Sequence, residues 1–248
     1  MVVYSGDLWG SLAQIGLTFC VLVIVGAIAF WRGRRRRSET LFLDVALSLG
    51  GWWVALSVLA LIVILLKAFT VDWVEIDGPA LSIPLPADFP CVSYGEAQGP
   101  AITCRTTSMS NFGVFNVSAG IHALVAVAQT CTLIVSTLPA ALIAFICFQT
   151  LRGRAFHRTV IRALVIGAIV LLVVGVAGDL LNDITGTLAL REVFPVGSPW
   201  YPEAFMLSAS GLPIGGAIAL AALAAVFHQG FRLQSERDQL QKDTEGLV

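Results

Sequence analysis

The sequence predicts an all-α membrane protein with five transmembrane helices and a small β-containing outer loop between spans two and three. Three observations predict this class. The 248 residues are 57% hydrophobic and only 12% charged, whereas ordinary soluble domains carry about 25% charged residues. Five apolar runs reach the roughly 20 residues that are needed to cross a bilayer. The basic residues are concentrated in alternate connections between these runs, as in multi-pass proteins.

The five expected spans share one physical requirement. In hydrocarbon every backbone amide must be paired within the protein, so each run is expected to be a helix. We expect a single integral membrane domain over residues 1–248, with an extracytoplasmic loop over 70–116 and a cytoplasmic tail over 228–248. The spans cover residues 8–31, 41–69, 117–151, 161–181 and 204–227.

Lys and Arg set the direction of the spans, because cytoplasmic connections are enriched in them. Four of these residues lie between residues 152 and 162, three lie in the tail, and five follow the first run, so twelve of the fifteen fall on one side. We therefore expect the N-terminus outside and the C-terminus inside. The five that follow the first run act as a topology anchor beside lipid headgroups; they are Arg32, Arg34, Arg35, Arg36 and Arg37. No direct nucleic-acid binding is expected.

The outer loop is predicted to hold a small antiparallel sheet. Its prolines exclude a long helix, while "VDWVEID" at 71–77 alternates acidic with apolar residues and "GVFNV" at 113–117 could pair with it. Cys91 and Cys104 also lie in this loop. An exterior compartment is oxidising, so we expect a disulfide between them, with two free thiols as the alternative.

Polar residues within the spans form the candidate intramembrane site. Asp179, Asn182 and Asp183 are spaced to share one helical face at the outer end of span four. His122 and Gln129 lie in the outer half of span three. Ionisable groups within spans are functional candidates, and an Asp179–His122 pair or a cation site is one interpretation. The alternative is that both aspartates meet water at the headgroup level.

The fifth run carries small residues at intervals of three and four, namely Ser208, Gly211 and Gly215. This pattern lets helices approach closely, either within the bundle or in a homodimer. Pro213 predicts a bend in that span. No metal-ligand spacing, phosphate-binding glycine loop or nucleophile–base pair is evident, so we expect no enzymatic activity and no cofactor.

The tail is expected to continue the fifth helix, because only Gly230 interrupts good helix formers. The final residues end in an apolar pair with a free carboxylate. We expect them to dock onto a cytoplasmic partner or onto the third loop, with a frayed, solvated end as the alternative. These six residues are Asp243, Thr244, Glu245, Gly246, Leu247 and Val248.

Two segments resemble a family of small bacterial integral membrane proteins known as domain-of-unknown-function 2975. One is the tail, "FHQGFRLQSERDQLQKDTEGLV", and the other is the basic loop "LRGRAFHRTVIRAL", with Gly153, Phe156, Arg158 and Arg162 at the matching positions. The resemblance covers residues of about 40–248 and leaves the first span as an addition. It implies a multi-pass protein of a bacterial cytoplasmic membrane, with four spans and a larger outer loop between the first two, and it carries no site residues. Some family members are encoded beside a small helix-turn-helix regulator.

These observations favour a non-enzymatic membrane sensor or partner of a cytoplasmic protein, such as a helix-turn-helix transcriptional regulator. One alternative is a small ion-coupled transporter that uses Asp179 and Asp183, although the sequence halves contain no clear repeat of the kind that transporters often have. Another alternative is an accessory subunit of a larger membrane complex.

Overall fold

A computed structural model describes residues 41–77, 90–93, 99–103, 111–152 and 158–245. The first predicted span and its arginine run lie outside this described part. Four of the described helices are long and apolar enough to cross a membrane, which indicates a multi-pass membrane protein. In chain order the elements are α2 (Leu41–Thr70), β1 (Trp73–Asp77), β2 (Ala101–Ile102), β3 (Asn111–Phe115), α3 (Ala119–Leu151), α4 (Arg158–Val193) and α5 (Gly211–Glu245).

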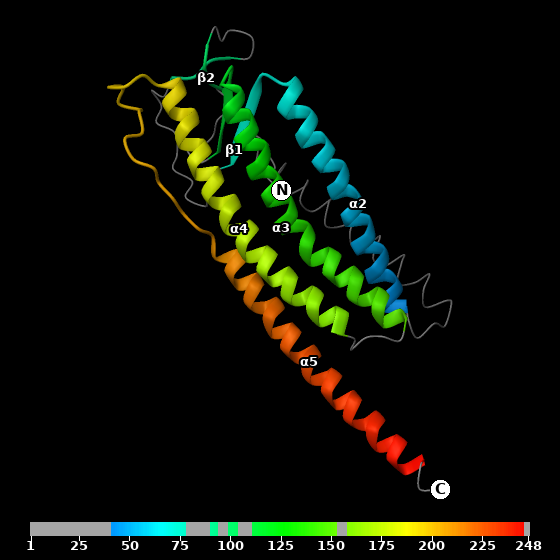
Figure 1. Ribbon diagram of the computed structural model, residues 1–248. Helices are drawn as coiled ribbons and strands as arrows, with labels where there is room; N and C mark the ends of the chain where they lie inside the picture. Colours follow the sequence, from blue (N-terminus) through cyan, green and yellow to red (C-terminus); the bar gives the residue numbers. More distant parts are fainter. Residues whose placement is uncertain (1–40, 78–89, 94–98, 104–110, 153–157, 246–248) are drawn as a thin grey trace, which may run out of the picture.

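The helices pack mainly against their neighbours in the chain, so that α2 meets α3, α3 meets α4 and α4 meets α5 (Figure 1). Small residues allow these contacts. A side chain at Gly50 would place its Cβ 2.8 Å from Ala144 Cβ and 2.9 Å from Ala140 O, so α2 approaches the backbone of α3. A Cβ at Gly175 of α4 would overlap the ring of Pro213 in α5. Close approach at small residues replaces the hydrophobic driving force that lipid does not supply.

The three strands form an antiparallel sheet in the order β1-β3-β2 at one end of the helices (Figure 1). Trp73 pairs with Phe115 and Ile76 pairs with Phe112, so the predicted pairing of the two segments is confirmed. Alternate residues of β1 face the helices, as the pleat requires. The inward side chains build a core with the nearest ends of α3 and α4 that comprises Ile76, Ile102, Phe112, Val114, Val117, Ile121, Val125, Ala189 and Phe194.

The predicted disulfide falls partly outside the described residues, because Cys104 is not among them. Its neighbour Thr103 forms a parallel bridge with Val92, next to Cys91, and the Val92 N–H donates to Ile102 O at 2.9 Å. The backbones that flank the two cysteines therefore lie side by side. The disulfide stays a prediction, whereas Cys131 and Cys147 within the helices are free thiols.

Two helices have other bounds than the spans expected within them. Helix α4 runs from residue 158 to 193, beyond the predicted 161–181, because its last turns pack against the sheet instead of ending in water. Helix α5 begins at Gly211 rather than at residue 204 and continues to Glu245. Pro213 thus lies in its first turn, where a missing N–H costs no helical hydrogen bond, and not inside the helix, where a bend was expected. The predicted continuation of this helix through the tail is confirmed.

The contact at Gly50 generates a stability prediction with a matched control. Replacing Gly50 by Val should push α2 away from α3 and lower stability by about 1–3 kcal/mol, the usual cost of overpacking. Gly51 is the next residue of the same helix, and a Cβ added there would meet nothing within 4 Å. Gly51→Val changes helix propensity equally, so thermal unfolding of both variants in detergent isolates the packing effect. Equal losses of stability in the two variants would contradict this contact.

Candidate functional site

Four polar side chains recur at every fourth position on one face of α4. They are Asp179, Asp183, Thr187 and Arg191, and residues four apart lie above one another on a helix. Asp183 and Thr187 are buried. Three of the four contact the non-helical segment 194–210, which leaves α4 at the sheet end of the molecule and runs back beside it to the start of α5 (Figure 1).

Two carboxylates of α4 bind two serines of this segment, each through the backbone and the side chain. The N–H and the hydroxyl of Ser210 donate to Asp179 Oδ2 at 2.7 and 2.8 Å. Ser208 donates to Asp183 Oδ2 through its N–H in a short hydrogen bond and through its hydroxyl at 3.0 Å. Charged acceptors strengthen such bonds. We call these contacts the carboxylate–serine pairs.

The spacing of the two partners explains why both pairs form at once. Four residues of α-helix advance about 6.0 Å, while two residues of extended chain advance about 6.6 Å and return the side chain to the same side. Asp179 and Asp183 are four apart, and Ser208 and Ser210 are two apart in "SAS". The two repeats therefore coincide when an extended segment lies antiparallel to the helix.

The C-terminal end of α4, beside the sheet, holds two further segments in place. Arg191 donates to the carbonyl oxygens of Pro202 at 3.0 Å and Glu203 at 2.9 Å, and its guanidinium lies 4.5 Å from the ring centroid of Phe205. The next residue, Glu192, accepts the N–H of Ser118 at 2.7 Å and its hydroxyl at 3.0 Å. Ser118 is the N-cap of α3, so α4 positions the starts of both α3 and α5.

The predicted pairing of Asp179 with His122 was wrong, because Asp179 binds Ser210. The alternative, that both aspartates simply meet water, was wrong for Asp183, which is only 7% exposed. The third residue of that predicted group, Asn182, is half-buried and forms no side-chain hydrogen bond within the described part of the chain. One oxygen of each aspartate, Oδ2, thus accepts two serine donors.

His122 and Gln129 belong to a separate site. They are seven residues apart on α3 and share one face, whereas Cys131 and Val135 on the opposite face contact Gly178 and Gly175 of α4. The face with His122 lines a cavity of about 70 Å³ between α3, the end of α2 and β1. Gln129 Nε2 lies 3.4 Å from Glu75 O. We call this cavity, which Lys67, Trp73 and Glu75 also line, the α2–α3–β1 cavity.

The predicted stripe of small residues does not form on one helix, because Ser208 precedes α5. A Cβ added at Gly211 or Gly215 would meet nothing within 4 Å, while one at Gly216 would meet Leu171 of α4. The contact of α5 with α4 therefore uses Pro213 and Gly216 instead. Whether Gly211 and Gly215 serve a homodimer stays a prediction.

Within the described ranges no group of three or more His, Cys, Asp or Glu side chains could hold a metal ion. Comparison with protein-family models, with curated proteins and with solved structures found no match for this chain. The resemblance to the domain-of-unknown-function 2975 family stays a prediction.

The sequence identified the aspartates as candidates but not Ser208 and Ser210, which bond them. It also missed Arg191, which holds the same segment farther along α4. The hydropathy of residues 204–210 suggested a helix, and a helical conformation separates two serines at i and i+2 onto different faces. The usable signal was the pair of matching repeats, D-x-x-x-D on a helix and S-x-S just before Gly and Pro. Such a match is visible only once an extended conformation is considered.

The pair between Asp183 and Ser208 generates the second prediction. Asp183→Ala removes the acceptor of the partly buried backbone N–H of Ser208, and leaving a buried donor unsatisfied costs about 1–3 kcal/mol. We expect a loss of this size in the free energy of unfolding in detergent. Glu203→Ala is the control, because Glu203 is exposed and its backbone oxygen, which the substitution keeps, is the group that bonds Arg191; surface changes stay within about 0.5 kcal/mol.

A double-mutant cycle separates this pair from a general effect of the substitution. Adding Ser208→Ala to Asp183→Ala should cost less than the sum of the two single changes, since contacting residues couple by roughly 0.5–3 kcal/mol. Strict additivity of the two variants would show that the contact does not contribute to stability.

Proposed function

We propose that this chain is a non-enzymatic sensor in a bacterial cytoplasmic membrane that communicates with a cytoplasmic protein, such as a helix-turn-helix regulator. The observation that supports this most directly is the length of α5. Its first half packs on α4 and its second half runs, as one unbroken helix, beyond the ends of the other helices (Figure 1). The sheet and the α2–α3–β1 cavity lie at the other end of the molecule, so the two ends suit an input and an output.

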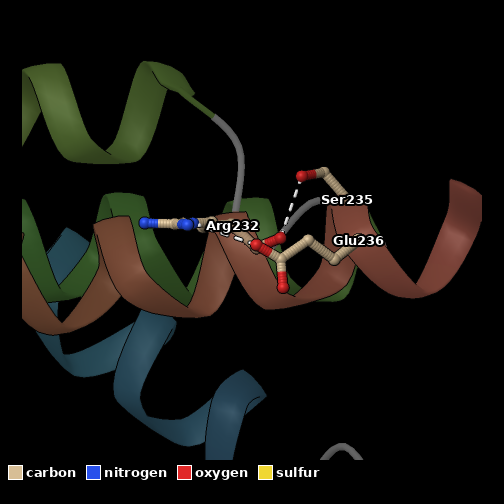
Figure 2. A network of polar contacts seen from close by, with 3 residues as sticks. All are labelled: Arg232, Ser235 and Glu236. Atoms are coloured by element: carbon tan, nitrogen blue, oxygen red, sulfur yellow. Dashed lines mark hydrogen bonds and ion pairs between the residues drawn. The ribbon is translucent and has the colours of Figure 1, made fainter.

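The projecting part of α5, residues 232–245, has the character of a solvated helix. Arg232 Nε and Glu236 Oε1 form an ion pair at 3.0 Å one turn apart, and the Ser235 hydroxyl donates to the carbonyl of Arg232 (Figure 2). Both charged side chains are more than half exposed, so the pair contributes only about 0.3–0.5 kcal/mol. Leu233 is 68% exposed beside them, which offers an apolar contact for a partner on a polar helix.

The point where α5 leaves the bundle is close to the start of α4. The guanidinium of Arg158 lies 5.5 Å from the ring centroid of Phe231, and Val160 and Leu164 pack with Ala224. A change in the packing of α4 would therefore reach the projecting helix directly. The final three residues of the proposed docking segment lie outside the described residues.

Two alternatives differ in their support. An ion-coupled transporter would need Asp179 and Asp183 to bind a cation, and their engagement with Ser210 and Ser208 speaks against it. An accessory subunit would pack against other membrane proteins through helix faces that the bundle leaves exposed. Helix α2 offers such a face, because its main helix contact is with α3. We keep that role as the second candidate.

The proposal includes five spans with the N-terminus outside, which the distribution of basic residues supports. A reporter enzyme that is active only in the cytoplasm should be active when fused after residue 245 and inactive when fused after Thr70. Residue 245 ends the tail, on the side that holds twelve of the fifteen basic residues. Thr70 ends α2, just before the acidic loop. Activity at both points, or at Thr70 alone, would overturn the orientation.

The output role is tested with photo-crosslinking amino acids in living cells. Placed at Leu233 and at Gln239, both exposed on the projecting helix, they should capture one and the same cytoplasmic protein. Val173 of α4 is 60% exposed within a membrane-spanning segment, so a crosslinker there should capture lipid or membrane proteins only. Adducts to the same membrane proteins at all three positions would favour the accessory subunit, and no adduct at Leu233 or Gln239 would reject the sensor.

A further inference from the structure

The α2–α3–β1 cavity combines an apolar wall with opposite charges at its edge. Its volume is about 70 Å³, and a single water needs about 10–15 Å³, so the space suits a solute of a few non-hydrogen atoms. Ile64, Val71 and Val125 supply apolar surface. The polar lining comes from three different elements, with Lys67 on α2, Glu75 on β1, and His122 and Gln129 on α3.

Lys67 and Glu75 do not neutralise each other across this cavity. The one ion pair within the described ranges joins Arg232 to Glu236, so the ammonium and the carboxylate of the cavity are more than the 4.0 Å of a salt bridge apart. Lys67 Nζ lies 6.0 Å from the ring centroid of Trp73, and both Lys67 and Glu75 are exposed at the edge. Two opposite charges held apart can each meet the opposite charge of one ligand.

The α3 side of the cavity leaves hydrogen-bonding capacity unused. His122 Nδ1 is buried and has no hydrogen-bond partner among the described residues. Gln129 donates to Glu75 O through Nε2 at a long 3.4 Å, while its amide oxygen remains an acceptor. Buried polar groups are nearly always paired in proteins, so the unpaired Nδ1 of His122 is unusual. Rotation of His122 or Gln129 toward a ligand would break no strong hydrogen bond.

We propose that this cavity binds a small zwitterion of the α-amino acid type, with its carboxylate toward Lys67 and its ammonium toward Glu75. The ring of Trp73 and the apolar wall cover the carbon skeleton, and Gln129 adds an acceptor for the ammonium. The ligand would be the input of the sensor, and in this role the inference rests on the proposed function. Because each ligand atom contributes a limited free energy, so small a solute binds with a Kd no tighter than about micromolar.

The test measures binding directly on the purified full-length chain in detergent. Equilibrium dialysis with radiolabelled glycine should give saturable binding that unlabelled alanine displaces. Acetate and methylammonium, which carry one charge each, should not displace it at the same concentration. Dialysis is preferred to a thermal shift because amino acids also stabilise proteins by exclusion from their surface.

Matched variants locate the site. Lys67→Gln and Glu75→Gln should each abolish saturable glycine binding, since both keep the approximate length of the side chain and remove one charge. Arg232→Gln removes a charge from the projecting helix and should bind glycine like the parent protein. Each variant should keep the parent's thermal unfolding profile, which shows that loss of binding is not loss of the fold.

Each outcome decides the inference. Displacement by acetate alone identifies an anion site, displacement by methylammonium alone identifies a cation site, and absence of saturable binding removes the site; each overturns the zwitterion. Binding that survives both Lys67→Gln and Glu75→Gln places the solute elsewhere and also overturns it. The crosslinks at Leu233 and Gln239 are measured without any ligand, so the output role stands or fails independently.

Discussion

The pairing of two α4 carboxylates with two serines is the interaction on which the placement of α5 depends. Non-helical backbone near a bilayer is tolerated only where its polar groups are satisfied by protein or water. Asp183 and Asp179 accept the backbone N–H groups of Ser208 and Ser210, and thereby hold the segment against α4. Pro213 can then enter the first turn of α5 beside Gly175. Without these acceptors the N–H groups of Ser208 and Ser210 would lose their partners on α4.

Different interactions stabilise the sheet end of the molecule and the long helices. At the sheet end, apolar side chains of all three strands pack on α3 and α4 in a core like that of a soluble domain. Along the spans, the helices meet at small residues and through single polar contacts, such as the Thr137 hydroxyl donating to Ser57 Oγ at 2.8 Å. Lipid gives no hydrophobic reason for helices to associate, so α2 is held mainly by α3. A ligand in the cavity would add a second link, from α2 to the sheet.

Residue patterns in the sequence identify some of the candidate site residues and miss others. Asp179 and Asp183 were identifiable because charged residues beside a span are uncommon and costly. Their partners were not, because serine carries no such cost beside a span, and Ser208 and Ser210 match the aspartates only when the chain between them is extended. Similarly, the separation of His122 from Asp179 depends on how α3 is rotated, and hydropathy around α3 is too uniform to fix that rotation.

The sequence by itself determined the described spans and the pairing of β1 with β3, because both follow from local properties: apolar length sets a membrane helix, and strict alternation sets a half-buried strand. Only the tertiary structure decided where α5 begins, which helix faces carry the polar groups, and that Lys67, Glu75 and His122 border one cavity. These features depend on contacts between residues far apart in the chain, such as Glu192 with Ser118. Such contacts leave no periodic signal, since each needs only one suitable donor and one suitable acceptor.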